Sequence, residues 1–261
     1  MTARTTLVTG SRSGMGKAVA ELLAARGERV VGADLADADI VADLAKPDGR
    51  AAAIEAVGGL CADGLDAVIA CAGLAIQDGP LMIAVNYFGA VDLIAGLHPL
   101  LARGTAPRAV AIVSTASILP SDAGLVELCL AGDEPGALAR ASGNPLSYAS
   151  SKLALLRWIR RTSILPGWAD AGVLLNGVAP GLVLTPMTAP IMATAEGRAQ
   201  LARSAPYVTP KQAVAEDVAL LLAFLASPDN RYMVGQVPFC DGGKDVLLRG
   251  DDVIIPAPGE F

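Results

Sequence analysis

The chain has 261 residues, of which 53% are hydrophobic and 18% charged, so it can bury a large core as one α/β domain spanning residues 1–261. Its formal net charge of −6 argues against nucleic acid and anionic membranes as partners, because both require a basic face. With one histidine, His98, and no closely spaced cysteines, we expect no metal site, no disulfide framework and no serine–histidine–aspartate triad. The four cysteines are Cys61, Cys71, Cys129 and Cys240.

The apolar runs are short. The longest ones, such as residues 218–226, fall below the roughly 18 residues that a membrane span needs. The first apolar run is interrupted at once by a glycine loop, which does not fit a secretory signal. We therefore expect no membrane partner and a cytoplasmic location.

Predicted strands and helices alternate along the chain. The strands are expected at residues 5–8, 28–33, 65–70, 108–113, 172–176 and 235–240, and the helices at residues 17–25, 82–101, 147–165 and 211–226. Such alternation implies right-handed crossovers and a doubly wound parallel sheet with helices on both faces. Ligands of such sheets bind at the carboxyl ends of the strands.

Residues 9–16 read TGSRSGMG and lie between the first predicted strand and the first predicted helix. There Gly10 would permit a tight turn, Gly14 would remove a side chain that blocks a pyrophosphate, and Gly16 would let the helix pack closely. The spacing is GxxxGxG rather than GxGxxG, and glycine turns before helices also occur for purely structural reasons. In this context the loop favours a dinucleotide as ligand.

Asp34 ends the second predicted strand, about 20 residues after the glycines, as dinucleotide sites require. A carboxylate there accepts hydrogen bonds from both hydroxyls of the adenosine ribose and repels a 2′-phosphate, which selects NAD over NADP. The alternative is an aspartate that only ends a strand. Arg12 in the glycine loop could partly offset the repulsion.

Two segments interrupt the alternation. Residues 118–143 are expected to contain short helices at 126–131 and 135–141, and residues 185–210 form an apolar but irregular stretch. We expect an insertion and a substrate lid on or beside the ligand side, although mobile surface excursions are the alternative. The lid's apolar side chains suit a rigid hydrophobic ligand or a dimer core, whereas its basic side chains could hold an anionic tail. The apolar ones are Met187, Ile191, Met192 and Tyr207, and the basic ones Arg198, Arg203 and Lys211.

Tyr148 and Lys152 stand one helical turn apart and therefore share one helix face. A free tyrosine is a poor acid or base at neutral pH, but a neighbouring ammonium and a positive nicotinamide ring would lower its pKa. Taken alone, the YxxxK pattern is common on solvated helices.

Several motifs occur together, in an order that resembles the short-chain dehydrogenase/reductase family over nearly the whole chain. They are the glycine loop, Asp34, Cys71–Gly73, Asn86, Ser114, the YxxxK pair Tyr148 and Lys152, Asn176 and Pro180–Gly181. The resemblance implies a single Rossmann-like domain, a nicotinamide cofactor, and hydride transfer between a carbonyl and an alcohol. Non-catalytic nucleotide binding, or a lyase or dehalogenase on the same scaffold, are the competing classes.

Carried over from the family, Tyr148 is the general acid or base, and Ser114 hydrogen-bonds the substrate oxygen. Lys152 binds the nicotinamide ribose and lowers the tyrosine pKa, and Asn86 holds a water that links Lys152 to solvent. Thr115 or Ser117 could replace Ser114 as the working hydroxyl.

The resemblance also implies a set of cofactor contacts. Cys71 departs from the family's usual asparagine, which makes it a packing residue rather than a nucleophile. The expected contacts are Gly10, Ser11, Arg12, Ser13, Gly14, Met15, Gly16, Asp34, Asp43, Leu44, Cys71, Ala72, Gly73, Tyr148, Lys152, Pro180, Gly181, Val183 and Thr185.

The interval between Ser114 and Tyr148 is much longer than in most family members, and the chain resembles a branch that acts on hydroxysteroids and bulky ketones. Supporting runs are residues 40–44, 71–74, 85–90 and 241–243, followed by a tail that ends in Phe261. This branch implies NAD, a small-molecule alcohol or ketone as partner, and a homodimer rather than the tetramer common in the wider family. A smaller or anionic secondary alcohol is the alternative substrate.

Overall fold

The computed structural model describes residues 3–251, so the tail that ends in Phe261 lies outside the described residues. A seven-stranded parallel sheet forms its centre, in the order β3-β2-β1-β4-β5-β6-β9. This confirms the predicted doubly wound, Rossmann-like fold. The strands are β1 Thr5–Thr9, β2 Arg29–Asp34, β3 Ile40–Val41, β4 Ala67–Ala70, β5 Arg108–Ile112, β6 Leu174–Pro180 and β9 Phe239–Cys240.

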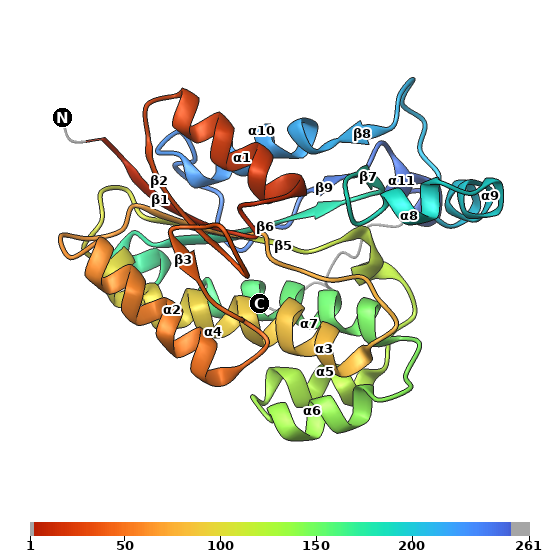
Figure 1. Ribbon diagram of the computed structural model, residues 1–261, viewed down its shortest axis with the longest axis horizontal. Helices are drawn as coiled ribbons and strands as arrows, with labels where there is room; N and C mark the ends of the chain where they lie inside the picture. Colours follow the sequence, from red (N-terminus) through yellow and green to blue (C-terminus); the bar gives the residue numbers. More distant parts are fainter. Residues whose placement is uncertain (1–2, 252–261) are drawn as a thin grey trace, which may run out of the picture.

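Helices cover both faces of the sheet (Figure 1). Helices α1 Gly14–Ala25 and α10 Ala215–Ala226 pack together on the upper face, and α2 Pro47–Leu60, α4 Ala90–Leu101 and α7 Ser147–Thr162 lie on the lower one. Each layer has its own apolar core. The upper core includes Val19 and Leu222, and the lower core includes Leu97 and Ile159, all four fully buried. Because the sheet winds outward from β1 and β4, these strands define the switch point where ligands bind.

The helix predicted at 82–101 begins earlier and changes its pitch. Asp78 caps α3 Gly79–Ile83 by accepting a 2.9 Å hydrogen bond from Leu81 N, and a π-helical turn at Ala84–Gly89 leads into α4. The run Gly79–Leu101 is long and apolar enough to span a membrane by length and composition. It corrects the expectation that every apolar run is too short. Since it packs under the sheet, it fits a core helix of this fold.

The insertion forms two short helices, as predicted. After a 3-10 turn at Thr115–Ile118 come α5 Ala123–Leu130 and α6 Glu134–Ala141. Asp122 and Asp133 cap them through hydrogen bonds from Leu125 N and Gly136 N. The pair packs on α3 and α7 at the bottom of the molecule (Figure 1).

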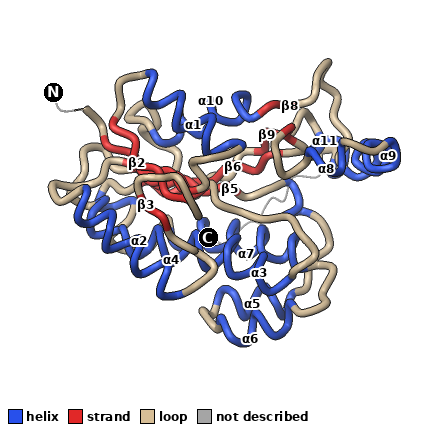
Figure 2. Tube along the Cα trace, in the orientation of Figure 1, coloured by secondary structure: helices blue, strands red, loops and turns tan. Residues whose placement is uncertain are grey.

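The lid is more ordered than the sequence suggested. It contains α8 Ala189–Met192 and α9 Ala195–Ser204, and it is bounded by the two-stranded pair of β7 Val183–Leu184 and β8 Ala213–Val214. Thr194 starts α9 by accepting a 3.0 Å bond from Gly197 N, a cap that the irregular apolar pattern did not indicate. With α11 Lys244–Arg249, these helices gather at one end of the sheet (Figure 2). A further 3-10 turn spans Ala169–Ala171.

Some predicted boundaries were wrong. Helix α10 starts at Ala215 rather than at residue 211, because Asp217 accepts a 2.9 Å bond from Val214 N and begins the helix there. Strand β6 runs on to Pro180, and β9 is shorter than expected. The lone His98 has a structural contact, as its Nε2 lies 2.8 Å from Gly167 O and its ring packs on Trp168.

Candidate active site

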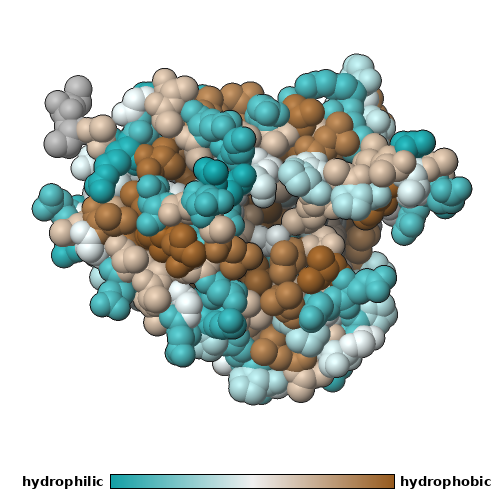
Figure 3. All heavy atoms as spheres, viewed as in Figure 1, coloured by the Kyte–Doolittle hydropathy of each residue, from teal (hydrophilic) through white to brown (hydrophobic). Residues whose placement is uncertain are grey.

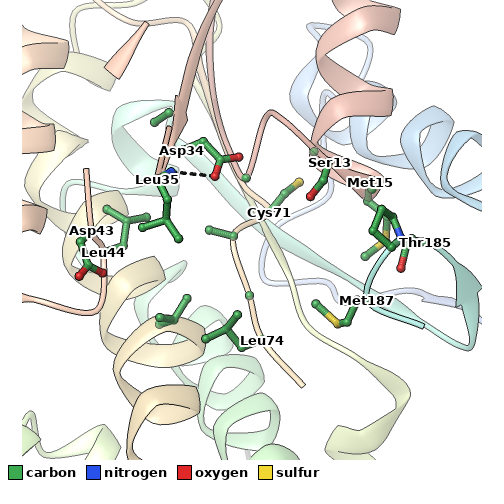
Figure 4. A pocket seen from close by; sticks show the side chains of 18 of the residues that line it. Ser13, Met15, Asp34, Leu35, Asp43, Leu44, Cys71, Leu74, Thr185 and Met187 are labelled. Carbon is green, nitrogen blue, oxygen red and sulfur yellow. Dashed lines mark hydrogen bonds between the residues drawn. The ribbon is translucent and has the colours of Figure 1, made fainter. Parts of the chain in front are cut away.

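A cavity of about 530 Å³ opens at the carboxyl ends of β1, β2 and β4, at the switch point of the sheet. Asp43 and Leu44 lie at one end of it and Thr185 and Met187 at the other, with Cys71 between them (Figure 4). On the face shown in Figure 3, hydrophobic residues gather around the hollow between the two helical layers.

Many of the expected cofactor contacts line this cavity. They are Gly10, Ser13, Gly14, Met15, Gly16, Asp34, Asp43, Leu44, Cys71, Ala72, Gly73 and Thr185. Sequence reasoning missed further lining residues, most of them apolar, because only the fold brings them together. These are Ala33, Leu35, Ala42, Leu74, Ile76, Leu81, Val85 and Pro186, whereas Met187, which was expected in the lid, also lines the cavity.

The glycine loop fits tightly against neighbouring backbone. Gly10 has a φ of 65°, and a Cβ there would lie 3.0 Å from Ala72 N. A Cβ on Gly16 would overlap the carbonyl oxygen of Gly10, so this glycine allows the loop to close on the first turn of α1. Gly14 has a φ of 51°, and a Cβ on it would come 3.5 Å from the side chain of Thr185. Bare backbone therefore faces the cavity, which fits a pyrophosphate.

Thr9 was missed as a site residue, although it is the first letter of the glycine motif. Its Oγ1 accepts hydrogen bonds from Cys71 N at 3.1 Å and Ala72 N at 3.0 Å. These bonds hold the end of β4 beside the glycine loop, so Thr9 shapes the floor of the cavity.

The carboxylate of Asp34 is held in one orientation at the cavity wall. One oxygen accepts a 2.9 Å bond from Arg12 N. The other accepts a 2.7 Å bond from Leu35 N (Figure 4). Arg12 thus contributes its backbone N–H to the carboxylate. A half-buried carboxylate fixed by two donors is suited to accept hydrogen bonds from a ribose.

Asp43 lies two residues beyond the short strand β3. Its carboxylate lies 3.1 Å from Lys46 Nζ and accepts a 3.0 Å bond from Ala45 N. The bond from Lys46 is the main cause that lowers the pKa of Asp43. The neighbouring Leu44 is buried and offers an apolar surface to a flat ring.

The YxxxK pair lies on α7, below the carboxyl end of β5. Lys152 is buried, its Nζ donates a 2.9 Å bond to Ile112 O, and burial lowers its pKa to about 8. Burial also raises the pKa of Tyr148, opposed by a hydrogen bond with Ser114. The lowering expected from a positive nicotinamide ring concerns the protein with cofactor bound and stays a prediction.

Ser114 is the hydroxyl that meets Tyr148. Its Oγ also accepts a local hydrogen bond from Ala116 N at 3.1 Å. The hydroxyl of Ser117 instead donates to Ser114 O at 2.8 Å, and Thr115 is buried. The geometry therefore favours Ser114 over both neighbours.

Asn86 lies in the π-helical turn, and both polar atoms of its side-chain amide make hydrogen bonds. Its Oδ1 accepts a 2.7 Å bond from Leu74 N, and its Nδ2 donates to Leu74 O at 2.9 Å and Ser151 Oγ at 3.3 Å. A Cβ on Gly73 would lie 3.2 Å from Asn86 Oδ1 and 3.6 Å from Lys152 Nζ. Gly73 lines the cavity, so Asn86 and Lys152 border it there.

Other expected contacts do not line the cavity. The hydroxyl of Ser11 is buried against Gly32 without a hydrogen-bond partner among the described residues, and Val183 is buried in β7. Gly181 donates a 3.1 Å bond to Cys240 O and packs against Asp241. Also absent from its lining are Arg12, Pro180, Asn86, Ser114, Tyr148 and Lys152. Asn176 ties β6 to the segment before β9, through bonds to Met233 O and from Gln236 N.

Cys71 replaces the family's usual asparagine beside Lys152. Burial raises the pKa of its thiol to about 12, which keeps it protonated and unreactive. All four cysteines are free. Within residues 3–251, no cluster of histidine, cysteine and acidic side chains is placed to hold a metal ion.

The parallel sheet, the glycine loop at the cavity, Ser114 after β5 and the pair Tyr148 and Lys152 on α7 define the class of protein: the chain belongs to the short-chain dehydrogenase/reductase family. It is therefore an oxidoreductase of a family that binds a nicotinamide cofactor. A family model described as enoyl-(acyl carrier protein) reductase matches residues 136–245.

Two relatives and one solved structure are especially similar. The chain is 36% identical to the 3-alpha-hydroxysteroid dehydrogenase/carbonyl reductase of Comamonas testosteroni, over 93% of this chain and 97% of that protein. It is 32% identical to the cis-4-hydroxycyclohexanecarboxylate dehydrogenase of Sinomonas cyclohexanicum, over 92% and 96%. The crystal structure of the 3-alpha-hydroxysteroid dehydrogenase from Pseudomonas sp. B-0831 complexed with NADH has a TM-score of 0.87 and 39% identity, over 95% and 100%.

Proposed function

We propose that the protein is an NAD(H)-dependent dehydrogenase that interconverts a secondary alcohol and a ketone at Tyr148. The observation that carries this proposal is the grouping of three residues: Ser114 interacts with the phenol of Tyr148, and buried Lys152 stands one helical turn from Tyr148 at the border of the cavity. A nicotinamide cofactor bound there supplies or accepts the hydride.

Each residue of this group has a role in moving the proton. Tyr148 donates its proton to the carbonyl oxygen during reduction and takes it back during oxidation. Ser114 donates a hydrogen bond to the same oxygen as negative charge develops. Lys152 Nζ stabilises the phenolate that Tyr148 becomes after it gives up its proton. Asn86 fixes the neighbouring backbone through its two hydrogen bonds with Leu74.

The choice of NAD rests on Asp34. Its fixed carboxylate accepts the ribose hydroxyls and repels a 2′-phosphate. The similar structure from Pseudomonas sp. B-0831 contains NADH, which supports this choice.

For the substrate, we favour a hydroxysteroid or another bulky apolar alcohol. Exposed apolar side chains stand at the rim of the cavity, namely Ile76, Leu81 and Met187. Two similar proteins are named for 3-alpha-hydroxysteroids. The name of a third gives the second candidate, an alicyclic alcohol that carries a carboxylate. Of the basic lid residues, Lys211 is paired with Asp217 at 3.2 Å, which leaves Arg198 and Arg203 as the stronger anion partners.

We also propose that the protein forms a homodimer in the cytoplasm. Helix α10 presents the exposed side chains Leu220 and Phe224, and Tyr232 is exposed near the sheet edge at β9. The insertion covers α3 and α7, so these helices are unavailable for further packing there. Light scattering should give the mass of two chains, and a monomer would contradict this part of the proposal.

The test of the reaction is Tyr148→Phe, assayed by loss of NADH absorbance with a 3-ketosteroid and a panel of smaller ketones. Turnover should fall about 100-fold or more while NADH binding is retained. Turnover of only small or anionic ketones by the unaltered protein would favour the second substrate. NADH binding without turnover of any ketone would favour a non-catalytic nucleotide-binding protein.

A further inference from the structure

A buried arginine on α2, Arg50, joins segments that lie far apart in the sequence. It is 2% exposed, and its Nε lies 2.8 Å from a carboxylate oxygen of Asp92 on α4. Its Nη2 lies 2.5 Å from Glu134, the first residue of α6 in the insertion. Its Nη1 donates to Leu44 O at 3.2 Å and Ala45 O at 3.5 Å. One guanidinium therefore joins the insertion, α4 and the segment between β3 and α2.

The planar guanidinium of Arg50 couples the positions of its partners, in addition to neutralising their charge. Its N–H donors form a fixed fork, so a partner that moves on one side changes the geometry offered to the others. A buried cation that loses a partner is costly, because solvent does not replace the lost contact. Removing Glu134 would thus leave Arg50 to reorient towards Asp92 or solvent and to weaken its bond with Leu44 O.

The segment that Arg50 holds forms the wall of the cavity at the end near Asp34. Leu44 and Asp43 line the cavity there (Figure 4). The segment is closely seated, since a Cβ on Gly89 would lie 3.2 Å from both the Cβ and the carbonyl oxygen of Leu44. A Cβ on Gly49 would overlap the carbonyl oxygen of Asp43. A small displacement of Arg50 would therefore move the cavity wall.

The other end of the link belongs to the insertion. Helix α6 begins at Glu134 and packs against α3, where Gly79 is so close to Ala141 O that an added Cβ would overlap it. Leu81 of α3 lines the same cavity. The insertion is thus seated on the cavity wall at α3 and, through Arg50, at Leu44.

We propose that Glu134 and Arg50 are positioning residues through which the insertion sets the affinity for the adenosine half of the cofactor. This inference rests on the proposed assignment of the cavity to a dinucleotide, with Asp34 and Leu44 at the adenosine end. The pair does not touch the cofactor but holds the backbone that does.

The test measures binding of NADH and of ADP-ribose to Glu134→Ala and Glu134→Gln. In Glu134→Ala the dissociation constants of both ligands should rise by the same factor, about fivefold to tenfold, because both contain the adenosine half. Turnover at saturating NADH should stay within about twofold. Glu134→Gln keeps the size and a hydrogen-bond acceptor, so its effect should be smaller and its folding secure.

Glu127→Gln is the matched control. Glu127 also lies in the insertion and pairs with an arginine, Arg157, at 3.3 Å, but this pair does not reach the cavity wall. Its variant should bind both ligands as the unaltered protein does.

Three results would overturn the inference. Unchanged dissociation constants in both Glu134 variants, even with a lower melting temperature, would show that Glu134 and Arg50 contribute only to stability. Loss of NADH affinity with unchanged ADP-ribose affinity would place the effect at the nicotinamide end. Failure of the unaltered protein to bind NADH would refute the proposed function itself, and this is seen before any variant is made.

Discussion

The substitution Asp34→Asn tests how this site distinguishes NAD from NADP. Its side chain keeps its size but loses its charge and one of two carboxylate oxygens. In the structure both oxygens are in use, one bonded to Arg12 N and the other to Leu35 N. The amide has one acceptor oxygen, so it forms fewer hydrogen bonds with the loop N–H groups and the ribose hydroxyls than the carboxylate does.

The expected magnitude follows from charge and hydrogen bonding. Two unit charges about 5 Å apart at an effective dielectric of about 20 repel by roughly 3 kcal/mol. Because Asp34 is only half-buried, solvent and salt reduce this to roughly 1–2 kcal/mol. A weakened hydrogen bond between ribose and side chain costs NADH roughly another 1.5 kcal/mol. Together these effects shift the preference for NADH over NADPH by about 100-fold.

The assay compares kcat/KM for NADH and NADPH with one ketone. Asp39→Asn is the matched control, because Asp39 also accepts a bond from β2, at Gly32 N, but does not line the cavity. It should leave the preference unchanged. If Asp34→Asn kept the original preference, or if the unaltered protein preferred NADPH, the role assigned to Asp34 would be refuted.

Two further predictions concern Lys152 and the glycine loop. Burial lowers the pKa of Lys152 from 10.5 to about 8, so between these values the unfolded chain binds more protons and the stability contributed by this group rises with pH. Lys152→Met should therefore abolish turnover yet raise the melting temperature at pH 7. This gain in melting temperature should shrink as pH rises from about 8 to 10.5. A gain that grew with pH would contradict the prediction. Gly16→Ala, whose Cβ would overlap Gly10 O, should weaken NADH binding by about tenfold or more and lower stability by roughly 1–3 kcal/mol. Gly58→Ala on α2 meets open space and should be neutral or stabilising by up to about 1 kcal/mol, and an equal loss in both variants would refute the loop argument.

The sequence predicted the order of strands and helices because apolar runs and their periods report burial directly. Strand β4 and helix α7, for example, coincide closely with the expected segments. The lid helices α8 and α9 escaped prediction, because they depend on caps such as Thr194 rather than on a regular apolar stripe. The π-helical turn at Asn86 also carries no local pattern, since it depends on packing around α3 and α4.

The candidate site was predictable where a motif fixes the local backbone and unpredictable where it depends on distant neighbours. The glycine loop and Asp34 belong to the first kind. The second kind includes Arg50, which is buried because the fold brings it to its partner Glu134 in the insertion. The raised pKa of Tyr148 is also of this kind, because burial comes from the tertiary fold.

The most direct test of the account is the turnover of Tyr148→Phe beside its affinity for NADH. We expect a loss of about 100-fold or more in ketone reduction, with NADH binding as in the unaltered protein. Turnover by the variant at the unaltered rate would contradict the assignment of Tyr148 as the proton donor, and with it the proposed reaction.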